Sequence, residues 1–312
     1  MKIYYGLDDF QTLDYAVVTS GTFDGVHFGH QKILQQVVSA TKAQSSYGAE
    51  SVLLTYHPHP RLVLFPDQKD LKLLTTLEEK IELVAKFGID HFVVIPFDKN
   101  FAAQTSKDFI ENVLVQKINT KQLIIGYDHK FGKNREGSFE YLKANEGLFG
   151  FTVQEIPKQD IDDIGVSSTK IRQALENGQV DLANTYLTYT YSLTGKVVRG
   201  NQIGRTIGFP TANIQPPSHK LVPAEGIYAV RVQIEEQIYN AMLYIGRRTT
   251  LGEDLARTVE VNIFDFNQNI YEKYLTLYFV KKLRGEEKFP SLEAMQAQLA
   301  IDKQNTLVAL GV

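Results

Sequence analysis

The sequence contains no cysteine among its 312 residues. This absence excludes disulfide bonds, cysteine nucleophiles and thiolate metal sites, so any metal ion has to be held by histidine or by oxygen donors. Long apolar runs are also missing. No segment approaches the roughly 20 apolar residues of a membrane-spanning helix, and residues 1–18 lack the apolar core of a signal peptide. We therefore expect a cytoplasmic protein with no membrane partner.

Strong charge of either sign is absent as well. The formal net charge is -3, which gives no general electrostatic reason to expect nucleic acid or an anionic membrane as a partner. A small or locally held ligand is favoured instead. The length of 312 residues predicts two domains with separate cores.

In the first half, short apolar segments alternate with segments of helical periodicity. Strands are expected at residues 16–19 and in "SVLLTY", "HFVVIPF" and "QLIIG". Helices are expected at residues 31–40 and 106–114, and a third begins with a capping box of Thr76 and Glu79 and stops at Gly88. This alternation predicts a parallel sheet covered on both faces, with ligands beyond the carboxyl ends of its strands.

The pattern changes after a helix that begins near Ser168. Segments rich in β-branched and aromatic residues follow, separated by turn signals: "YSLTGKVV", "GIYAVRVQI", "QIYNAMLYIG", "TVEVNIFDF" and "YLTLYFVKKL". They predict a closed or nearly closed antiparallel barrel, followed by a final helix that Ser291 caps after Pro290. We place the domains at residues 1–185 and 186–312.

The stretch "GTFDGVHFGH", residues 21–30, leads from a predicted strand into a predicted helix. Free backbone N–H groups and the positive end of the helix dipole gather at such a turn, which suits a phosphate. His27 and His30 add side-chain donors for a triphosphate and a departing pyrophosphate. Two alternatives remain open from the residues alone: a zinc site on the two histidines, and a tight turn in which they are incidental.

A second set of phosphate donors lies far along the chain in "VSSTKIRQAL", where serines, a threonine, Lys170 and Arg172 stand at a helix start. Taken alone, this stretch favours an N-cap with a solvated basic face over a phosphate site. The first stretch, however, is similar to the Gly-x-Phe-Asp-Gly-x-His-x-Gly-His signature of the nucleotidylyltransferase superfamily, and "SSTKIR" resembles its second motif.

The segments between these motifs resemble bacterial FAD synthetases, which are bifunctional. They are "TYHPHPRLVLFP", "LLTTLEEK", "IPFDKNFAAQTSKDFI" and "IIGYDHKFGKNREG". Three residues depart from the usual pattern: Tyr56, His57 and His129. His57 and His59 also suit a metal, but we favour loop residues near the ligand.

The resemblance implies a Rossmann-like domain in which an FMN phosphate oxygen attacks the α-phosphorus of ATP and pyrophosphate leaves. Such a reaction asks the protein mainly for positioning and charge stabilisation. The residues implied to stabilise the phosphates are His27, His30, Ser168 and Arg172. Those implied to shape the pocket or bind nucleotide or flavin are Gly21, Phe23, Asp24, Gly29, Asp128, Ser167 and Thr169.

The second half carries its own motif in "GKVVRGNQIGRTIGFPTANI". "GFPTAN" resembles the Pro-Thr-Ala-Asn motif of riboflavin kinases, which implies that Thr211 and Asn213 help to hold Mg²⁺ and the ATP phosphates. The residues assigned by this resemblance to nucleotide or flavin binding are Gly200, Gly204, Arg205, Gly208, Pro210, Thr211 and Asn213.

A kinase that acts on an alcohol needs a carboxylate base. In "TVEVNIFDF", alternation places Val259 and Val261 on one face and Glu260 on the other. Glu260 matches the catalytic glutamate of riboflavin kinases. Departures are Tyr244 for Asn, Thr249 for Pro and Glu272 for Gly, the last of which costs about 1 kcal/mol if φ is positive there.

Together these observations predict a Rossmann-like α/β nucleotidylyltransferase domain followed by an antiparallel β-barrel riboflavin kinase domain with a C-terminal helix. The chain is expected to convert riboflavin to FMN and FMN to FAD with Mg²⁺ and ATP, releasing ADP and pyrophosphate, without nucleic acid. One alternative is an FMN adenylyltransferase with a kinase-impaired, flavin-binding barrel. Another is a flavin or nucleotide sensor that binds nucleic acid. The sequence predicts no oligomeric state.

Overall fold

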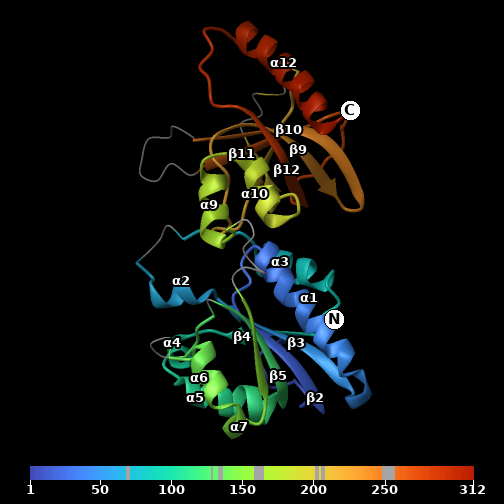
Figure 1. Ribbon diagram of the computed structural model, residues 1–312. Helices are drawn as coiled ribbons and strands as arrows, with labels where there is room; N and C mark the ends of the chain where they lie inside the picture. Colours follow the sequence, from blue (N-terminus) through green and yellow to red (C-terminus); the bar gives the residue numbers. More distant parts are fainter. Residues whose placement is uncertain are drawn as a thin grey trace. The chain divides into compact units, whose positions relative to one another are not determined.

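The chain divides into two compact units, Met1–Ser167 and Ser168–Val312 (Figure 1). The computed structural model describes residues 1–67, 71–127, 129–132, 136–157, 165–200, 204, 208–247 and 257–312. The compact units part before the helix that begins at Ser168. The domain boundary predicted from the sequence falls at residues 185 and 186, and it remains a prediction.

The first unit is built on a six-stranded parallel sheet, as its continuously apolar strands predict. The spatial order is β1-β4-β3-β2-β5-β6. The strands are β1 (Lys2–Tyr5), β2 (Tyr15–Ser20), β3 (Ala49–His57), β4 (His91–Pro96), β5 (Thr120–Gly126) and β6 (Thr152–Ile156). The two edge strands, β1 and β6, were not among the segments expected from the sequence.

Nine helical segments connect these strands among the described residues. They are α1 (Phe28–Ala43), η1 (Ser45–Tyr47), α2 (Pro60–Leu64), α3 (Leu77–Ala85), α4 (Lys99–Ala102), α5 (Ser106–Asp108), η2 (Phe109–Lys117), α6 (Phe139–Ala144) and α7 (Glu146–Phe149). The predicted capping box of α3 is present, with Thr76 and Glu79 bonded to each other's backbone N–H. The helix expected at residues 106–114 extends to Lys117, and η2 is a π-helix, in which Ile118 N–H bonds to the Val113 carbonyl.

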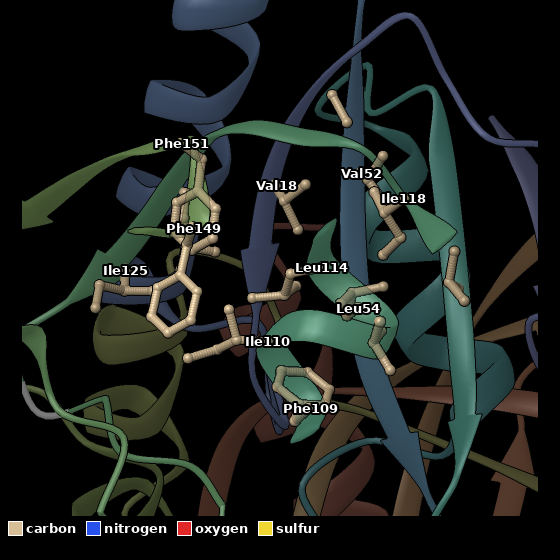
Figure 2. Close-up of a cluster of buried hydrophobic side chains, with 14 of the residues drawn as sticks. Val18, Val52, Leu54, Phe109, Ile110, Leu114, Ile118, Ile125, Phe149 and Phe151 are labelled. Carbon is tan, nitrogen blue, oxygen red and sulfur yellow. The ribbon is translucent and has the colours of Figure 1, made fainter. Parts of the chain in front are cut away.

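Two hydrophobic clusters cover the two faces of the sheet. Successive side chains on a strand point to opposite faces, so Val17 and Val18 of β2 belong to different clusters. On one face, Val17 packs with apolar residues of α1 and α3. On the other, Val18 lies with Ile110 and Leu114 of η2 (Figure 2). The sheet is therefore covered on both faces, as predicted.

The second unit contains a closed antiparallel barrel of six strands in the order β10-β11-β8-β7-β12-β9. The strands are β7 (Ser192–Val198), β8 (Ala212–Gln215), β9 (Gly226–Ile234), β10 (Gln237–Arg247), β11 (Arg257–Ile263) and β12 (Tyr274–Arg284). Five of these match the predicted segments. The sixth, β8, begins at the "ANI" part of the kinase-like motif and was missed as a strand.

The second unit includes the helices α9 (Ser168–Glu176), α10 (Val180–Leu187) and α12 (Leu292–Leu310) among its described residues. Ser291 caps α12 as predicted, because its hydroxyl accepts the Ala294 N–H. Asp302 of α12 is 1% exposed and accepts three hydrogen bonds from Arg284 at the end of β12, at 3.0 Å, 3.2 Å and 2.7 Å. This ion pair ties α12 to the barrel wall. Within the described part of the chain, no helix is both long and apolar enough to cross a membrane.

Candidate active sites

The stretch at residues 21–30 begins where β2 ends, at the carboxyl edge of the parallel sheet (Figure 1). Strand order reverses between β2 and β5, because β3, β4 and β1 continue on one side and β6 on the other. Ligands of open α/β sheets bind at such a reversal. The predicted phosphate site therefore lies where this fold class places its ligands.

The turn that opens the site is held in an unusual backbone conformation. Phe23, Gly25 and Val26 all have positive φ, at 47°, 83° and 37°. Only glycine adopts such values without strain. The Phe23 ring is buried over Gly21, where an added Cβ would come within 3.1 Å of it. Strain of this kind persists only where neighbouring contacts enforce it.

Asp24 supplies those contacts. Its side chain is 2% exposed, and Oδ1 accepts the backbone N–H of Leu74 at 3.0 Å and of Thr75 at 3.2 Å. In return, the Thr75 hydroxyl accepts the Gly25 N–H at 3.1 Å. Asp24 thus joins the turn to the segment that precedes α3. Asp24 therefore supports the turn structurally.

His27 and His30 lie together at the start of α1. Their rings are stacked with centroids 3.7 Å apart, and Phe23 packs against His30 at 5.0 Å. The pKa of His30 lies well below its usual value because of burial first, then the nearby His27 and Lys80. His30 is therefore a neutral imidazole at pH 7. Its Nδ1 is buried and has no hydrogen-bond partner among the described residues.

The end of α1 itself suits an anion. The first turn carries no acidic residue, and the N-cap residue, His27, makes no side-chain cap bond. Gly29 is buried in this first turn. Unopposed N–H groups and the helix dipole therefore remain available for negative charge. With respect to the zinc alternative, the described residues bring no group of three His, Cys, Asp or Glu side chains together around a metal position.

Sequence reasoning missed Lys80. Its side chain is 6% exposed, and Nζ donates to the Thr22 carbonyl at 2.6 Å and to the Thr55 hydroxyl at 3.3 Å. Burial lowers its pKa to about 8, while Asp24 opposes the shift. The signal was present in the sequence: Lys80 follows Leu77 by three residues and precedes Val84 by four, so it falls on the apolar face of α3.

The three residues of the first unit that depart from the FAD synthetase pattern are Tyr56, His57 and His129, and the structure describes the contacts or exposure of each. The Tyr56 hydroxyl lies 2.8 Å from Ser20 Oγ, and burial raises the pKa of Tyr56 to about 12. His57 is exposed at the end of β3, while His59 caps α2 by accepting the Arg61 N–H at 3.2 Å. His129 packs 5.6 Å from the Phe131 ring. Asp128 lies outside the described residues.

The second phosphate motif forms the start of α9, as predicted. Ser168 is the first residue of this helix, Thr169 and Arg172 follow within it, and Ser167 directly precedes it. The division between the two compact units falls between Ser167 and Ser168, so α9 belongs to the second unit while His27 and His30 belong to the first. The pairing of this motif with His27 and His30 therefore stays a prediction.

In the barrel, the register brings the predicted kinase residues together. Glu260 on β11 pairs with Asn213 on β8. Val259 and Val261 are buried, and Glu260 is half-buried between them, so Glu260 points away from the core, as alternation predicted. Residues paired across antiparallel strands share a face. Glu260 and Asn213 therefore project on the same side of the barrel wall.

Neighbouring contacts complete this group. The Thr211 hydroxyl donates to Glu260 Oε2 at 3.3 Å. Asn262 Nδ2 donates to the Pro210 carbonyl at 2.7 Å, which fixes the motif against β11. Asn262 was not among the predicted site residues, although it lies two positions after Glu260 on the same face.

Glycines of the kinase-like motif lie so close to neighbouring atoms that a side chain would not fit at Gly200 or Gly204. A Cβ at Gly200 would lie 2.1 Å from Asn213 Nδ2, and one at Gly204 would lie 2.2 Å from the Phe209 carbonyl oxygen. Gly208 has a φ of 79°, which favours glycine. Arg205 lies outside the described residues.

Two of the three departures in the barrel are described. Tyr244 pairs with Glu260 from the other neighbouring strand, and its hydroxyl donates to Glu286 Oε1 at 2.6 Å. Burial, followed by the nearby Glu286, raises the pKa of Tyr244. Glu272 has a φ of 66°, so the expected backbone cost applies, and its carboxylate pairs with Lys196 at 2.5 Å. Thr249 lies outside the described residues.

Comparisons with known proteins cover both units. A family model described as FAD synthetase matches residues 9–170, and one described as riboflavin kinase matches residues 187–310. A crystal structure titled as a macrolide-efflux protein from Streptococcus pneumoniae aligns with a TM-score of 0.87 at 32% identity, over 97% of this chain and 98% of that one.

Named relatives match over nearly their full length. The bifunctional riboflavin kinase/FMN adenylyltransferase of Listeria monocytogenes is 37% identical, over 93% of this chain and 91% of the relative. The protein of the same name from Haemophilus influenzae is 38% identical, over 97% of both chains. The two family matches and these relatives show that the chain belongs to the family of bifunctional riboflavin kinase/FMN adenylyltransferases.

Proposed function

We propose that this chain phosphorylates riboflavin to FMN in its barrel and adenylylates FMN to FAD in its first unit, with ATP as the co-substrate of both reactions. The observation that carries the proposal is the folding of each family motif into its own local group of donors and carboxylates. One group is formed by His27 and His30 at the N-terminus of α1, and the other by Thr211, Asn213 and Glu260 on the barrel.

In adenylyl transfer, an FMN phosphate oxygen attacks the α-phosphorus of ATP, and the bond to the pyrophosphate oxygen breaks. Phosphate is already an adequate nucleophile, so the site acts by positioning and by stabilising negative charge. His27, His30 and the N–H groups of α1 serve this purpose. Because His30 is neutral, it acts as a hydrogen-bond donor and requires no change of charge.

Ser168 and Arg172 are proposed to stabilise phosphate charge in the same reaction, with Ser167 and Thr169 binding nucleotide. The FAD synthetase model extends to residue 170, beyond the end of the first compact unit, which supports assigning the start of α9 to adenylyl transfer. Gly21, Phe23, Asp24 and Gly29 shape the pocket, and Asp128 is proposed to bind nucleotide or flavin.

In the kinase reaction, Glu260 is proposed to accept the proton of the ribityl primary hydroxyl. The alkoxide oxygen then attacks the γ-phosphorus of ATP, and ADP leaves. The Thr211 hydroxyl that donates to Glu260 orients the carboxylate. Gly200, Gly204, Arg205, Gly208 and Pro210 are proposed to bind the nucleotide or flavin.

The oxygen donors beside Glu260 fit Mg²⁺. Hydroxyl, carboxamide and carboxylate oxygens are its preferred protein ligands, and Mg²⁺ on a nucleotide usually takes only one or two of them. Thr211 and Asn213 would hold the ion, which neutralises phosphate charge when bound. We further propose a cytoplasmic enzyme whose ligands are riboflavin, FMN, FAD, ATP, ADP and pyrophosphate.

Two variants test the assignment. His30→Ala should abolish FAD formation from FMN and spare FMN formation from riboflavin, whereas Glu260→Gln should do the reverse. Products are separated by chromatography after incubation with ATP and Mg²⁺. His219→Ala and Glu236→Gln, at exposed positions, are the matched controls. Equal impairment of both reactions by either test variant, in folded protein, would refute the two-site assignment.

The same assay tests the alternative of an adenylyltransferase with an impaired kinase. Tyr244 beside Glu260 and Glu272 at positive φ are the observations that favour it. Wild-type protein that forms FAD from FMN but no FMN from riboflavin would establish this alternative.

A further inference from the structure

Lys80 presents a buried charge that the roles assigned above do not use. It lies on the face of α3 that also carries Leu77, Ile81 and Val84. Methionine or leucine would fill this position without the penalty of burying an ammonium group. A role in packing alone therefore leaves the charge unexplained.

The ammonium group is bonded to the turn that opens the adenylyl-transfer site. Nζ donates to the Thr22 carbonyl at 2.6 Å and to the Thr55 hydroxyl at 3.3 Å, and this hydroxyl donates to the same carbonyl at 3.2 Å. Thr22 lies between Gly21 and the strained residues that follow. Lys80 therefore fixes the turn from the α3 side, while Asp24 fixes it through the segment before α3.

The charge of Lys80 is incompletely balanced among the described residues. Asp24 is the carboxylate whose field favours the ammonium form, yet no ion pair within 4.0 Å joins the two groups. Asp24 Oδ1 is engaged by Leu74 and Thr75 instead. An ammonium group has three donors, and two are used. Positive charge thus remains at the base of a site built for anions.

We propose that Lys80 is a positioning residue for adenylyl transfer, which holds the Thr22 carbonyl and, at neutral pH, supplies positive charge that favours the bound ATP phosphates. This inference rests on the proposed adenylyl transfer in the first unit. The charge acts over a distance at which Lys80 also influences His30. Lys80 itself makes its hydrogen bonds to the protein.

His30 and Tyr56 do not change charge in the pH range in which Lys80 is expected to lose its proton. His30 is neutral above pH 7 because its pKa is lowered, and Tyr56, beside Thr55, has a pKa of about 12. Other charged or titratable residues around this turn, among those described, are Asp24, whose field acts on Lys80, His27, which stacks on His30 at the N-cap of α1, and Glu79, which precedes Lys80 in α3. With a pKa of about 8, Lys80 is expected to lose its proton between about pH 7 and about pH 9.5.

The pH dependence of FAD formation tests the proposal in wild-type protein. kcat/KM for ATP reports groups of the free enzyme. With a pKa of about 8, it should fall about thirtyfold from about pH 7 to about pH 9.5. The fall in kcat should occur at higher pH, because bound phosphate raises the pKa of Lys80. A flat kcat/KM over this window contradicts the proposal.

Variants separate the charge from the hydrogen bond. Lys80→Gln keeps a neutral donor for Thr22, and Lys80→Arg keeps a charge that does not titrate here. We expect Lys80→Gln to lower kcat/KM at least tenfold at neutral pH, and Lys80→Arg to restore part of it without the alkaline fall. Wild-type kcat/KM in Lys80→Gln, or an unchanged alkaline fall in Lys80→Arg, refutes the role of the charge. Circular dichroism and urea unfolding of the same samples report folding of the first unit, and kinase activity reports that of the barrel.

Proton uptake gives a measurement that does not depend on turnover. Titrations with ATP in buffers of different ionisation enthalpy, at about pH 8, should show wild type taking up about half a proton more than Lys80→Arg. ATP that binds at the kinase site changes the proton uptake of wild type and of Lys80→Arg by the same amount, so this contribution cancels in the difference. Equal proton uptake by wild type and Lys80→Arg would contradict the role of Lys80 and leave the proposed adenylyl transfer untouched. FAD formation by the His30→Ala variant would instead contradict the proposed function.

Discussion

We expect the Asp24 carboxylate to contribute most of the hydrogen bonding that holds the turn at residues 21–25 in place. Asp24→Ala removes the acceptor of the Leu74 and Thr75 N–H groups, which the structure places 3.0 Å and 3.2 Å from Oδ1. A buried donor left without a partner costs about 1–3 kcal/mol. Two such donors predict a local loss of about 2–6 kcal/mol. Asp24→Asn keeps an oxygen acceptor and should cost about 1–2 kcal/mol, since only the charge assistance is lost.

Hydrogen exchange of the full-length protein measures this loss. Peptides covering residues 71–80 should exchange roughly thirtyfold faster or more in Asp24→Ala, and less so in Asp24→Asn. The KM for ATP in FAD formation should rise in parallel, while FMN formation stays unchanged. Asp9→Ala, at an exposed position, is the control. Exchange in Asp24→Ala within about threefold of wild type would show that the turn is held by other contacts.

Three further predictions concern separate parts of the molecule. Gly200→Ala should lower kinase activity at least tenfold and spare FAD formation, because the new Cβ would lie 2.1 Å from Asn213 Nδ2; equal activity would show that Asn213 moves freely. Asp302→Ala should destabilise the barrel by about 3 kcal/mol, since Arg284 loses a buried partner. The midpoint of urea-induced loss of kinase activity measures this effect, and an unchanged midpoint contradicts it. Lys80 has a lower pKa in the folded protein, about 8, than in the unfolded chain, 10.5, so the unfolded chain binds more protons between these values. The unfolding free energy of wild type should therefore rise relative to Lys80→Met by up to about 3 kcal/mol over that window and stay level below it; a parallel pH dependence in urea titrations of both proteins would refute this assignment.

Local patterns accounted for most of the fold. The capping box of Thr76 and Glu79 fixed the start of α3, and alternation in β11 correctly turned Glu260 away from the core. Such features depend on neighbours in the sequence, whose spacing is visible in one chain. The edge strands β1 and β6 and the four-residue β8 were missed because short strands carry too few residues to show a period.

Site features that depend on distant partners were less accessible. Asp24 was expected in the pocket, but its acceptor role depends on residues about 50 positions away in the chain. Lys80 was overlooked because a charged residue on an apolar helix face is usually solvated, and its partner Thr22 lies 58 positions away. Only the fold brings such groups into hydrogen-bond range.

Closure of the barrel also constrains how the length of β11 around Glu260 can change. Tyr244, Glu260 and Asn213 form one row across β10, β11 and β8, and β11 is hydrogen-bonded on both edges. A one-residue insertion within β11 before Glu260 would reverse which side chains face inward, burying the carboxylate and exposing Val261. Neither ladder could slide to compensate, because every strand of a ring has two fixed neighbours. An insertion in this strand therefore requires a β-bulge, such as those that shift the register between β12 and β9.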